Sequence, residues 1–303
     1  TWAESEGLER VILSGMGRSF AAGADTKEFD QPAISPHLPD VVNRIETSTV
    51  PWIAAIHGTA LGGGGELALG CRYRIARANA TIGFPEVILG LVPGAGATQR
   101  LPRLVGLAEA LKLIPTGKTI SGKAAMAIGL VNAIDDDPVA AAKLIDQKIL
   151  SEAVPLSLMK AGTDKTVNYD TARQIAIRRM RGQEAPLTAI SLLETAQTAT
   201  FDDGMQKERN AFLALRASSQ ARALRHIFFA ERAAKKPPKA IETQKPTLKP
   251  LNHVIVIGGG TMGSGIAYAF LNANIRVTIL ESDDAGMQRA NPAVDIIISA
   301  SLA

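Results

Sequence analysis

Residues 61–69 read Leu61-Gly62-Gly63-Gly64-Gly65-Glu66-Leu67-Ala68-Leu69 and follow a short apolar run, Ile53-Ala54-Ala55-Ile56. The apolar run predicts a buried strand, and the residues after the glycines predict a helix. Four successive glycines cost conformational entropy, so we expect the backbone to approach another group closely there. A helix that begins inside the glycines would point free N–H groups at a ligand oxygen. The stretch therefore predicts an α/β fold with a turn suited to an oxyanion.

A second acidic residue, Glu86, ends the run Thr81-Ile82-Gly83-Phe84-Pro85-Glu86. Two neighbouring carboxylates can divide acid and base work between them when their site raises the pKa of one. Each glutamate also has an ordinary structural explanation. Glu66 can complement a helix dipole, and Pro85-Glu86 can begin a helix. The pair has a chemical meaning only if the fold brings the two turns together.

The pattern of apolar and turn-forming residues changes at about residue 135. Before it, short β-branched runs alternate with glycine-rich turns, which is typical of an α/β domain. The predicted strands are residues 11–14, 52–57 and 73–76. Residues 136–234 have apolar side chains at helical spacing and predict a helical extension of the 1–135 core.

The Lys- and Pro-rich residues 235–251 predict a linker, because they offer little to bury and proline interrupts helices. Residues 252–303 then begin with Val254-Ile255-Val256-Ile257, a continuous apolar run that predicts a strand buried on both faces of a parallel sheet.

A dinucleotide-binding pattern follows that strand directly. Gly258-Gly259-Gly260-Thr261-Met262-Gly263 satisfies G-x-G-x-x-G and leads into a helix pattern, so a pyrophosphate could rest on the helix N-terminus. A second apolar run, residues 276–280, ends in an acid placed to bind a ribose hydroxyl and to disfavour NADP. We therefore expect NAD to contact Gly258, Gly260, Met262, Gly263 and Glu281.

The composition is that of a soluble globular protein, with 46% hydrophobic residues, 20% charged residues and a formal net charge of +4 over 303 residues. The basic residues are spread along the chain and do not indicate nucleic-acid binding. The single cysteine, Cys71, excludes an intramolecular disulfide and a cysteine-based metal cluster, and we expect it in the core. We expect no metal site. No apolar run is long enough to span a bilayer, so we expect no membrane insertion.

Four blocks of sequence resemble the enoyl-CoA hydratase/isomerase (crotonase) family in their order and spacing. They are Phe20-Ala21-Ala22-Gly23-Ala24-Asp25, the glycine run to Glu66, residues 90–104 and residues 117–132. The helical zone, linker and Gly258 motif are similar to multifunctional fatty-acid oxidation enzymes, which join a crotonase domain to a 3-hydroxyacyl-CoA dehydrogenase. The resemblance implies a crotonase-like β-β-α spiral with a helical extension, followed by a truncated Rossmann-type β-α-β unit.

The resemblance also implies roles for single residues. Glu66 and Glu86 would be the catalytic pair, and the N–H groups of Ala24 and Gly63 would hold the thioester oxygen. Further substrate contacts would come from Ala22, Asp25, Gly62, Pro85 and Gly94. The implied reaction is syn addition of water to a 2-trans-enoyl-CoA, giving a 3-hydroxyacyl-CoA without a cofactor. Isomerisation of a Δ3 to a Δ2 double bond, with Glu86 carrying the proton, is a second implied activity.

The sequence departs from this pattern at both ends. The opening hairpin and helix of the crotonase domain and the catalytic His and Glu of the dehydrogenase have no match, so we expect a fragment of a longer enzyme. Two other interpretations stay open, a CoA- or NAD-binding fragment without chemistry and another acyl-CoA reaction of the superfamily, such as hydrolysis or dehalogenation.

We expect a cytoplasmic protein of bacterial type, or a peroxisomal one if the source is eukaryotic. Partners by resemblance are further copies of the chain or a thiolase. We expect His57 to be a hydrogen-bonded core residue, and Arg100 and Arg103 to serve contacts between subunits or domains.

Overall fold

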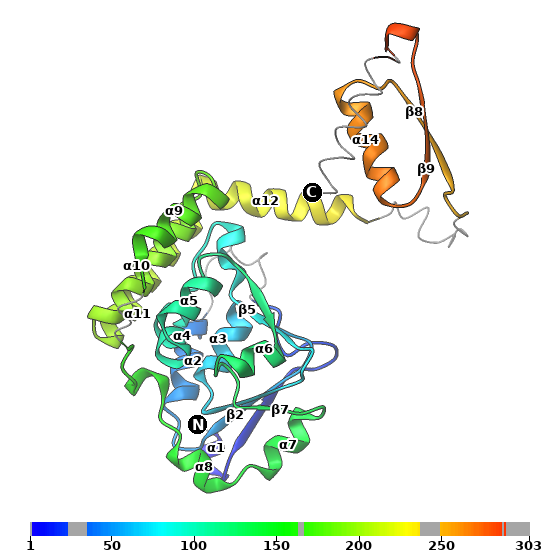
Figure 1. Cartoon of the computed structure of the whole chain (residues 1–303). Coiled ribbons are helices and arrows are strands. Elements are labelled where there is room, and N and C mark those ends of the chain that lie inside the picture. Colours follow the sequence, from blue (N-terminus) through cyan, green and yellow to red (C-terminus); the bar gives the residue numbers. More distant parts are fainter. Residues whose placement is uncertain (1, 24–34, 163–166, 237–248, 287, 289–303) are drawn as a thin grey trace. The chain divides into compact units, whose positions relative to one another are not determined.

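The computed structural model describes residues 2–23, 35–162, 167–236, 249–286 and 288. The chain divides into two units, Thr1–Lys235 and Lys236–Ala303, and Figure 1 labels most of the elements of both. Most of the predicted linker, residues 237–248, lies outside the described residues.

The first unit contains two sheets. The larger is parallel, in the order β1-β2-β4-β7, and the smaller has the order β3-β5-β6, with β6 antiparallel to β5. Their strands are β1 (Val11–Ser14), β2 (Trp52–Ile56), β3 (Thr59–Leu61), β4 (Tyr73–Ala76), β5 (Thr81–Gly83), β6 (Thr119–Ser121) and β7 (Ala133–Ile134). The consecutive strands β2 and β3 enter different sheets, as do β4 and β5, so each of these two pairs adds one strand to each sheet. The expected spiral is confirmed, and the three predicted strands agree with the structure to within one residue.

Helices surround these sheets and continue to the end of the unit. Those of the core are α1 (Trp2–Ser5), α2 (Leu38–Glu46), α3 (Gly63–Gly70), the 3-10 helix η2 (Pro85–Leu89), α4 (Ala97–Val105), α5 (Leu107–Leu113) and α6 (Gly122–Ala127). Those that follow are α7 (Pro138–Leu144), α8 (Gln147–Glu152), the 3-10 helix η3 (Leu156–Leu158), α9 (Tyr169–Arg179), α10 (Ala185–Thr198), α11 (Phe201–Ala217) and α12 (Ser219–Ala234).

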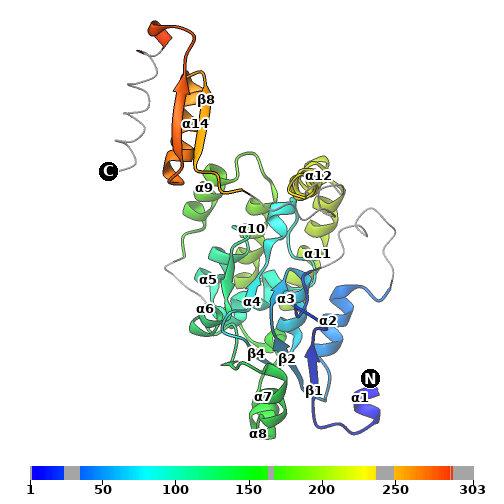
Figure 2. The same cartoon turned by 90° about the vertical axis from the view of Figure 1, so that its right-hand side faces the viewer.

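The larger sheet separates two hydrophobic clusters. Helix α7 packs on β1, β2 and β4, where Ile53 and Ile75 meet Ala142 and Leu150. Figure 2 shows α7 and α8 below these strands. The main cluster includes Ile56, Leu69 and Leu101. Cys71 belongs to it as expected, and burial raises the pKa of its thiol to about 12.

The helical extension covers the part of the core that carries the glycine-rich turns. Helix α10 contacts α4 and α5, α11 contacts α4, and α12 contacts η2. These contacts join residues that lie about a hundred positions apart in the sequence, so side chains of α11 can reach the N-terminus of α4.

The second unit contains the parallel pair β8 (His253–Ile257) and β9 (Arg276–Leu280), with α14 (Thr261–Asn272) packed on both strands. The side chains of Ile255 and Ile257 are 57% and 86% exposed. The expected burial of this strand on both faces is therefore wrong for the described residues. The reason is that α14 covers one face of the pair, and alternate side chains of a strand point to opposite faces.

Candidate active site

Glu66 is held at the start of α3. The helix begins at Gly63, inside the glycine run as predicted, after Gly62 with φ of 54° in a conformation that favours glycine. The Oε1 atom of Glu66 accepts hydrogen bonds from the N–H groups of Ala95 at 2.8 Å and Ala97 at 3.1 Å. Burial raises the pKa of Glu66, while these two N–H groups oppose that rise by stabilising the carboxylate.

Glu86 has a different environment. It follows Pro85 in the first turn of η2, and its Oε2 atom is buried with no hydrogen-bond partner among the described residues. Burial raises the pKa of Glu86 well above its ordinary value, and the nearby charges of Glu66 and Glu208 raise it further. The protonated form of Glu86 is therefore favoured, whereas Glu66 has donors directed at its carboxylate.

Close packing of the glycines brings the two turns together. A Cβ atom added to Gly62 would lie 2.9 Å from Oε1 of Glu86, and one added to Gly65 would lie 2.8 Å from Cε1 of Phe84. Larger side chains at these positions would push the start of α3 away from the segment that carries Glu86. The glycine run is thus a requirement for the meeting of the two carboxylates.

Both glutamates line one cavity of about 1340 Å³ in the first unit. The other predicted residues that line it are Ala22, Gly62, Gly63, Pro85 and Gly94. As a first-turn residue, Gly63 has an N–H group without an intrahelical acceptor, so it can bind a ligand oxygen. Ala24 and Asp25, the other expected oxyanion and substrate residues, lie outside the described residues.

Sequence reasoning missed the contribution of α11 and α12. The cavity is also lined by Arg209, Phe212, Arg216, Phe228, Phe229 and Arg232. Behind them, the fully buried Glu208 accepts hydrogen bonds from the backbone N–H groups of Gly96 and Thr98. A signal for it existed, because Glu208 lies on the buried side of α11 with Gly204 and Leu215, at spacings of a helical face.

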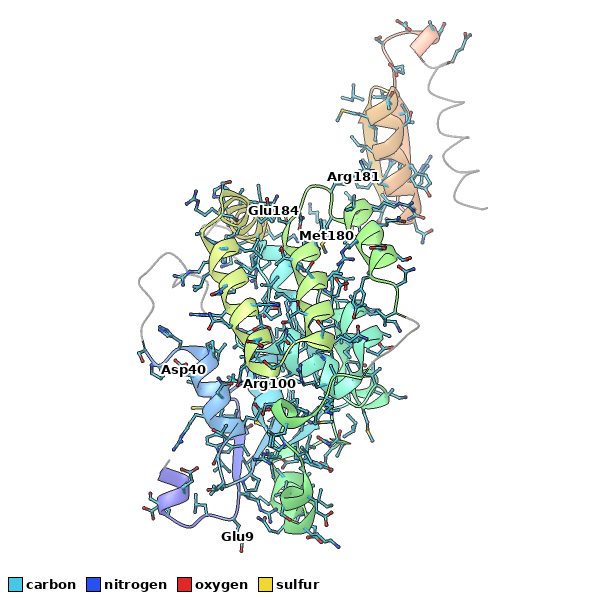
Figure 3. The ribbon with its side chains drawn as sticks, turned by 90° about the vertical axis from the view of Figure 1, so that its left-hand side faces the viewer. Glu9, Asp40, Arg100, Met180, Arg181 and Glu184 are labelled. Atoms are coloured by element: carbon cyan, nitrogen blue, oxygen red, sulfur yellow. The ribbon has the colours of Figure 1, made fainter. Side chains whose placement is uncertain are left out.

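Two arginines predicted to serve subunit or domain contacts have partners within the first unit. Arg100 is completely buried, pairs with Glu46 at 2.8 Å and donates to the carbonyl of Ala95 at 3.0 Å. Figure 3 labels it where α2 meets the start of α11. Arg103 donates to the carbonyls of Gln99 and Met159. The burial of Arg100 is not that of a subunit contact, since a buried guanidinium needs its partners within the same fold, whereas Arg103 joins the core to Met159 of the helical extension.

His57 is half-buried, and its Nε2 atom lies 3.1 Å from the carbonyl oxygen of Gly17. The expected hydrogen bond is confirmed, while full burial is not. The described residues contain no group of three His, Cys, Asp or Glu side chains arranged for a metal ion. They also contain no helix with the length and apolar character needed to cross a membrane.

The glycine turn of the second unit has the shape that a pyrophosphate requires. Gly258 has φ of 89°, and a Cβ atom on Gly263 would lie 1.7 Å from the carbonyl oxygen of Gly258. Beside Gly258 and Gly260 the space is open. The N–H group of Gly259 donates to the carboxylate of Glu281, and Met262 is exposed at the start of α14. These residues fit a dinucleotide.

A family model for enoyl-CoA hydratase/isomerase matches residues 2–211. The chain belongs to the enoyl-CoA hydratase/isomerase family. A second model, for the NAD binding domain of 3-hydroxyacyl-CoA dehydrogenase, matches residues 253–301 of this family member. The hydratase/isomerase domain is therefore fused to part of a dehydrogenase NAD-binding domain, as the resemblance implied.

Curated relatives of this hydratase/isomerase family member are named as bifunctional enzymes and as a subunit of a fatty acid oxidation complex. The chain is 38% identical over 302 residues to a peroxisomal bifunctional enzyme of Cavia porcellus, covering 96% of this chain and 42% of that protein. It is 35% identical to the fatty acid oxidation complex subunit alpha of Shewanella baltica, covering 92% of this chain and 42% of that protein. The chain thus spans about two-fifths of the length of these relatives.

Among solved structures, the enoyl-CoA hydratase/isomerase of Pseudoalteromonas atlantica aligns over 74% of this chain and 79% of its own, with a TM-score of 0.53. At 24% identity this likeness concerns the fold alone.

Proposed function

We propose that the first unit hydrates 2-trans-enoyl-CoA thioesters to 3-hydroxyacyl-CoA, as part of a multifunctional β-oxidation enzyme. The observation that carries this proposal is the contrast between the two cavity carboxylates. Glu66 accepts two backbone hydrogen bonds that favour its charged form, while Glu86 is buried without a partner for Oε2, which favours its protonated form. The pair can thereby offer an acid and a base at the same time.

The two glutamates then have separate roles. Glu66 accepts a proton from water as the water oxygen bonds to C3, and Glu86 delivers its proton to C2. The C2–C3 π bond breaks, one C–O and one C–H bond form, and the proton on Glu66 returns to Glu86 to restore the pair. Addition from the side on which both carboxylates lie gives syn stereochemistry.

Polarisation of the thioester completes the site. As water adds at C3, negative charge develops on the thioester oxygen, and a fixed N–H donor stabilises it by about 3 kcal/mol. The N–H group of Gly63 lines the cavity and serves this purpose. We assign the second donor to Ala24 from the family resemblance. No cofactor takes part in this reaction.

The second unit supplies a dinucleotide site in this proposal. NAD, when bound, accepts a hydride from a 3-hydroxyacyl substrate. Gly258 and Gly260 leave open space for its pyrophosphate at the start of α14, Gly263 lets the helix pack closely on the turn, and Glu281 orders the turn through Gly259. The location in the cell, further copies of the chain and a thiolase partner stay predictions from the resemblance.

Isomerisation of a Δ3 to a Δ2 double bond is a second candidate activity. The unpartnered Oε2 of Glu86 favours it, because in the ionised form a carboxyl oxygen without a fixed donor can take a proton from C2 and return it to C4.

The test is a hydration assay on the purified 303-residue chain, following the absorbance of the conjugated thioester of crotonyl-CoA and identifying the product. We expect Glu66→Gln and Glu86→Gln each to lower kcat by about 10²–10⁴-fold, because each removes one proton-transfer partner. Glu152→Gln, an exposed glutamate of α8, is the matched control and keeps the original kcat. Unchanged kcat in both active-site variants would reject the mechanism.

A further inference from the structure

Four successive backbone N–H groups at the start of α4 are divided between two buried carboxylates. Ala95 and Ala97 donate to Glu66, at 2.8 and 3.1 Å. Gly96 and Thr98 donate to Glu208, at 2.6 and 2.8 Å. The turn therefore lies between Glu66 on one side and Glu208 on the other, and neither glutamate can shift without changing the donors of its neighbour.

Glu208 makes a third contact that fixes its orientation. Its Oε2 atom accepts the hydroxyl of Thr98 at 2.6 Å, and that hydroxyl in turn accepts from Nε2 of Gln99 at 3.0 Å. The side chain is completely buried, so water does not replace these bonds when one is lost. It extends from α11, while Glu66 extends from α3. The turn is thus held by two elements far apart in the sequence.

Glu208 is not one of the residues that line the cavity, whereas Glu66, Gly94 and Ala95 are. Its place behind the turn separates it from the substrate. A change at Glu208 should therefore alter how Glu66 is held and leave the substrate-binding surface as it is.

We propose that Glu208 is a positioning residue for Glu66. By binding the N–H groups of Gly96 and Thr98, it fixes the turn so that the alternate N–H groups of Ala95 and Ala97 stay directed at the Glu66 carboxylate. The inference rests on the proposed hydration and assigns a role in it to α11. Burial and the charge of Glu66 raise the pKa of Glu208 to about 8, while its hydrogen bonds from Thr98 and Gly96 oppose that rise.

The first test compares Glu208→Ala with Glu208→Gln in the crotonyl-CoA assay. Alanine frees both donors of the turn, and we expect kcat to fall by about 10²-fold, as a small misplacement of a catalytic group does. KM should stay within about twofold of its original value, because the variant leaves the surface that binds the substrate unchanged. Glutamine keeps one acceptor oxygen and should recover most of the lost kcat. Asp202→Asn removes an exposed carboxylate from the same helix and is the matched control.

The second test does not depend on activity. Hydrogen exchange of the Ala95 and Ala97 amides, measured by NMR on the whole chain, should accelerate in Glu208→Ala and stay slow in Asp202→Asn. If the original chain shows no hydration, the proposed function fails, while these exchange rates still decide the positioning role. If Glu208→Ala does not fold, Thr98→Val replaces it, because it removes the hydroxyl bound to Glu208, and it should lower kcat with unchanged KM. Original kcat in every folded variant, or unchanged exchange at Ala95 and Ala97, would overturn the inference.

Discussion

Two glycine-rich turns at helix N-termini, one in each unit, have opposite surroundings. The turn before α3 lies among buried residues, so that added Cβ atoms would meet Ala21, Phe84 and Glu86. The turn before α14 is open at Gly258 and Gly260, and the strand that leads into it has exposed isoleucines. The same local pattern thus gives an enclosed site in one unit and an open one in the other. Carboxylates with raised pKa values belong to the enclosed turn, because burial is the largest cause of the rise.

The largest difference between the units should appear at the strands that lead to the turns. Ile53 on β2 is completely buried, whereas Ile257 on β8 is 86% exposed. Ile53→Ala should lower the free energy of unfolding of the first unit by about 2–5 kcal/mol. Ile257→Ala should change that of the second unit by less than about 0.5 kcal/mol.

Tryptophan fluorescence during urea denaturation follows the first unit, since both tryptophans, Trp2 and Trp52, belong to it. Hydrogen exchange of β8 peptides follows the second unit. Similar losses of unfolding free energy in the two isoleucine variants would show that β8 is covered in solution. The difference in burial between the two strands would then not hold.

An intermediate effect is expected at the turns themselves. A Cβ atom on Gly64 would lie 2.2 Å from the carbonyl oxygen of Ala21, whereas one on Gly260 would meet nothing within 4 Å. Gly64→Ala should destabilise the first unit by about 1–3 kcal/mol through overpacking and lower kcat for hydration. Gly260→Ala should leave the exchange protection of the second unit unchanged. A Gly64→Ala protein with the original stability and kcat would contradict the close approach.

A further effect concerns the pH dependence of stability. The pKa of Glu208 rises from 4.5 to about 8 on folding, so the native state binds this proton more tightly than the unfolded state. Its stabilisation is complete below the unfolded value of about 4.5 and is lost as pH rises towards about 8. Glu208→Gln should therefore flatten the decline in the free energy of unfolding over this range.

Glu66 and Glu86 still titrate in that variant, so the slope should decrease without reaching zero. The measurement is urea denaturation followed by tryptophan fluorescence at several pH values. An identical slope in the two proteins would show that Glu208 does not change its protonation in this range.

Much of the local structure could be predicted from the sequence. The strand at residues 11–14, the start of a helix inside the glycine run and the Gly258 turn all follow from short-range patterns that one segment contains by itself. Glu66 and Glu86 could be selected because glycine or proline beside an acid is a local signal. Their meeting could not be predicted from periodicity, because it depends on how closely α3 packs against Phe84.

The sequence by itself determined the family, the positions of three strands of the larger sheet and the identity of the two cavity glutamates. Only the tertiary structure decided that Glu208 shares the turn with Glu66 and that Arg100 is buried beside it. The physical reason is that these contacts join residues that lie far apart in the sequence. Gly96 and Glu208 lie 112 residues apart, and a backbone N–H group can donate to any carboxylate that packing brings near. No local pattern specifies which acid of α11 that will be.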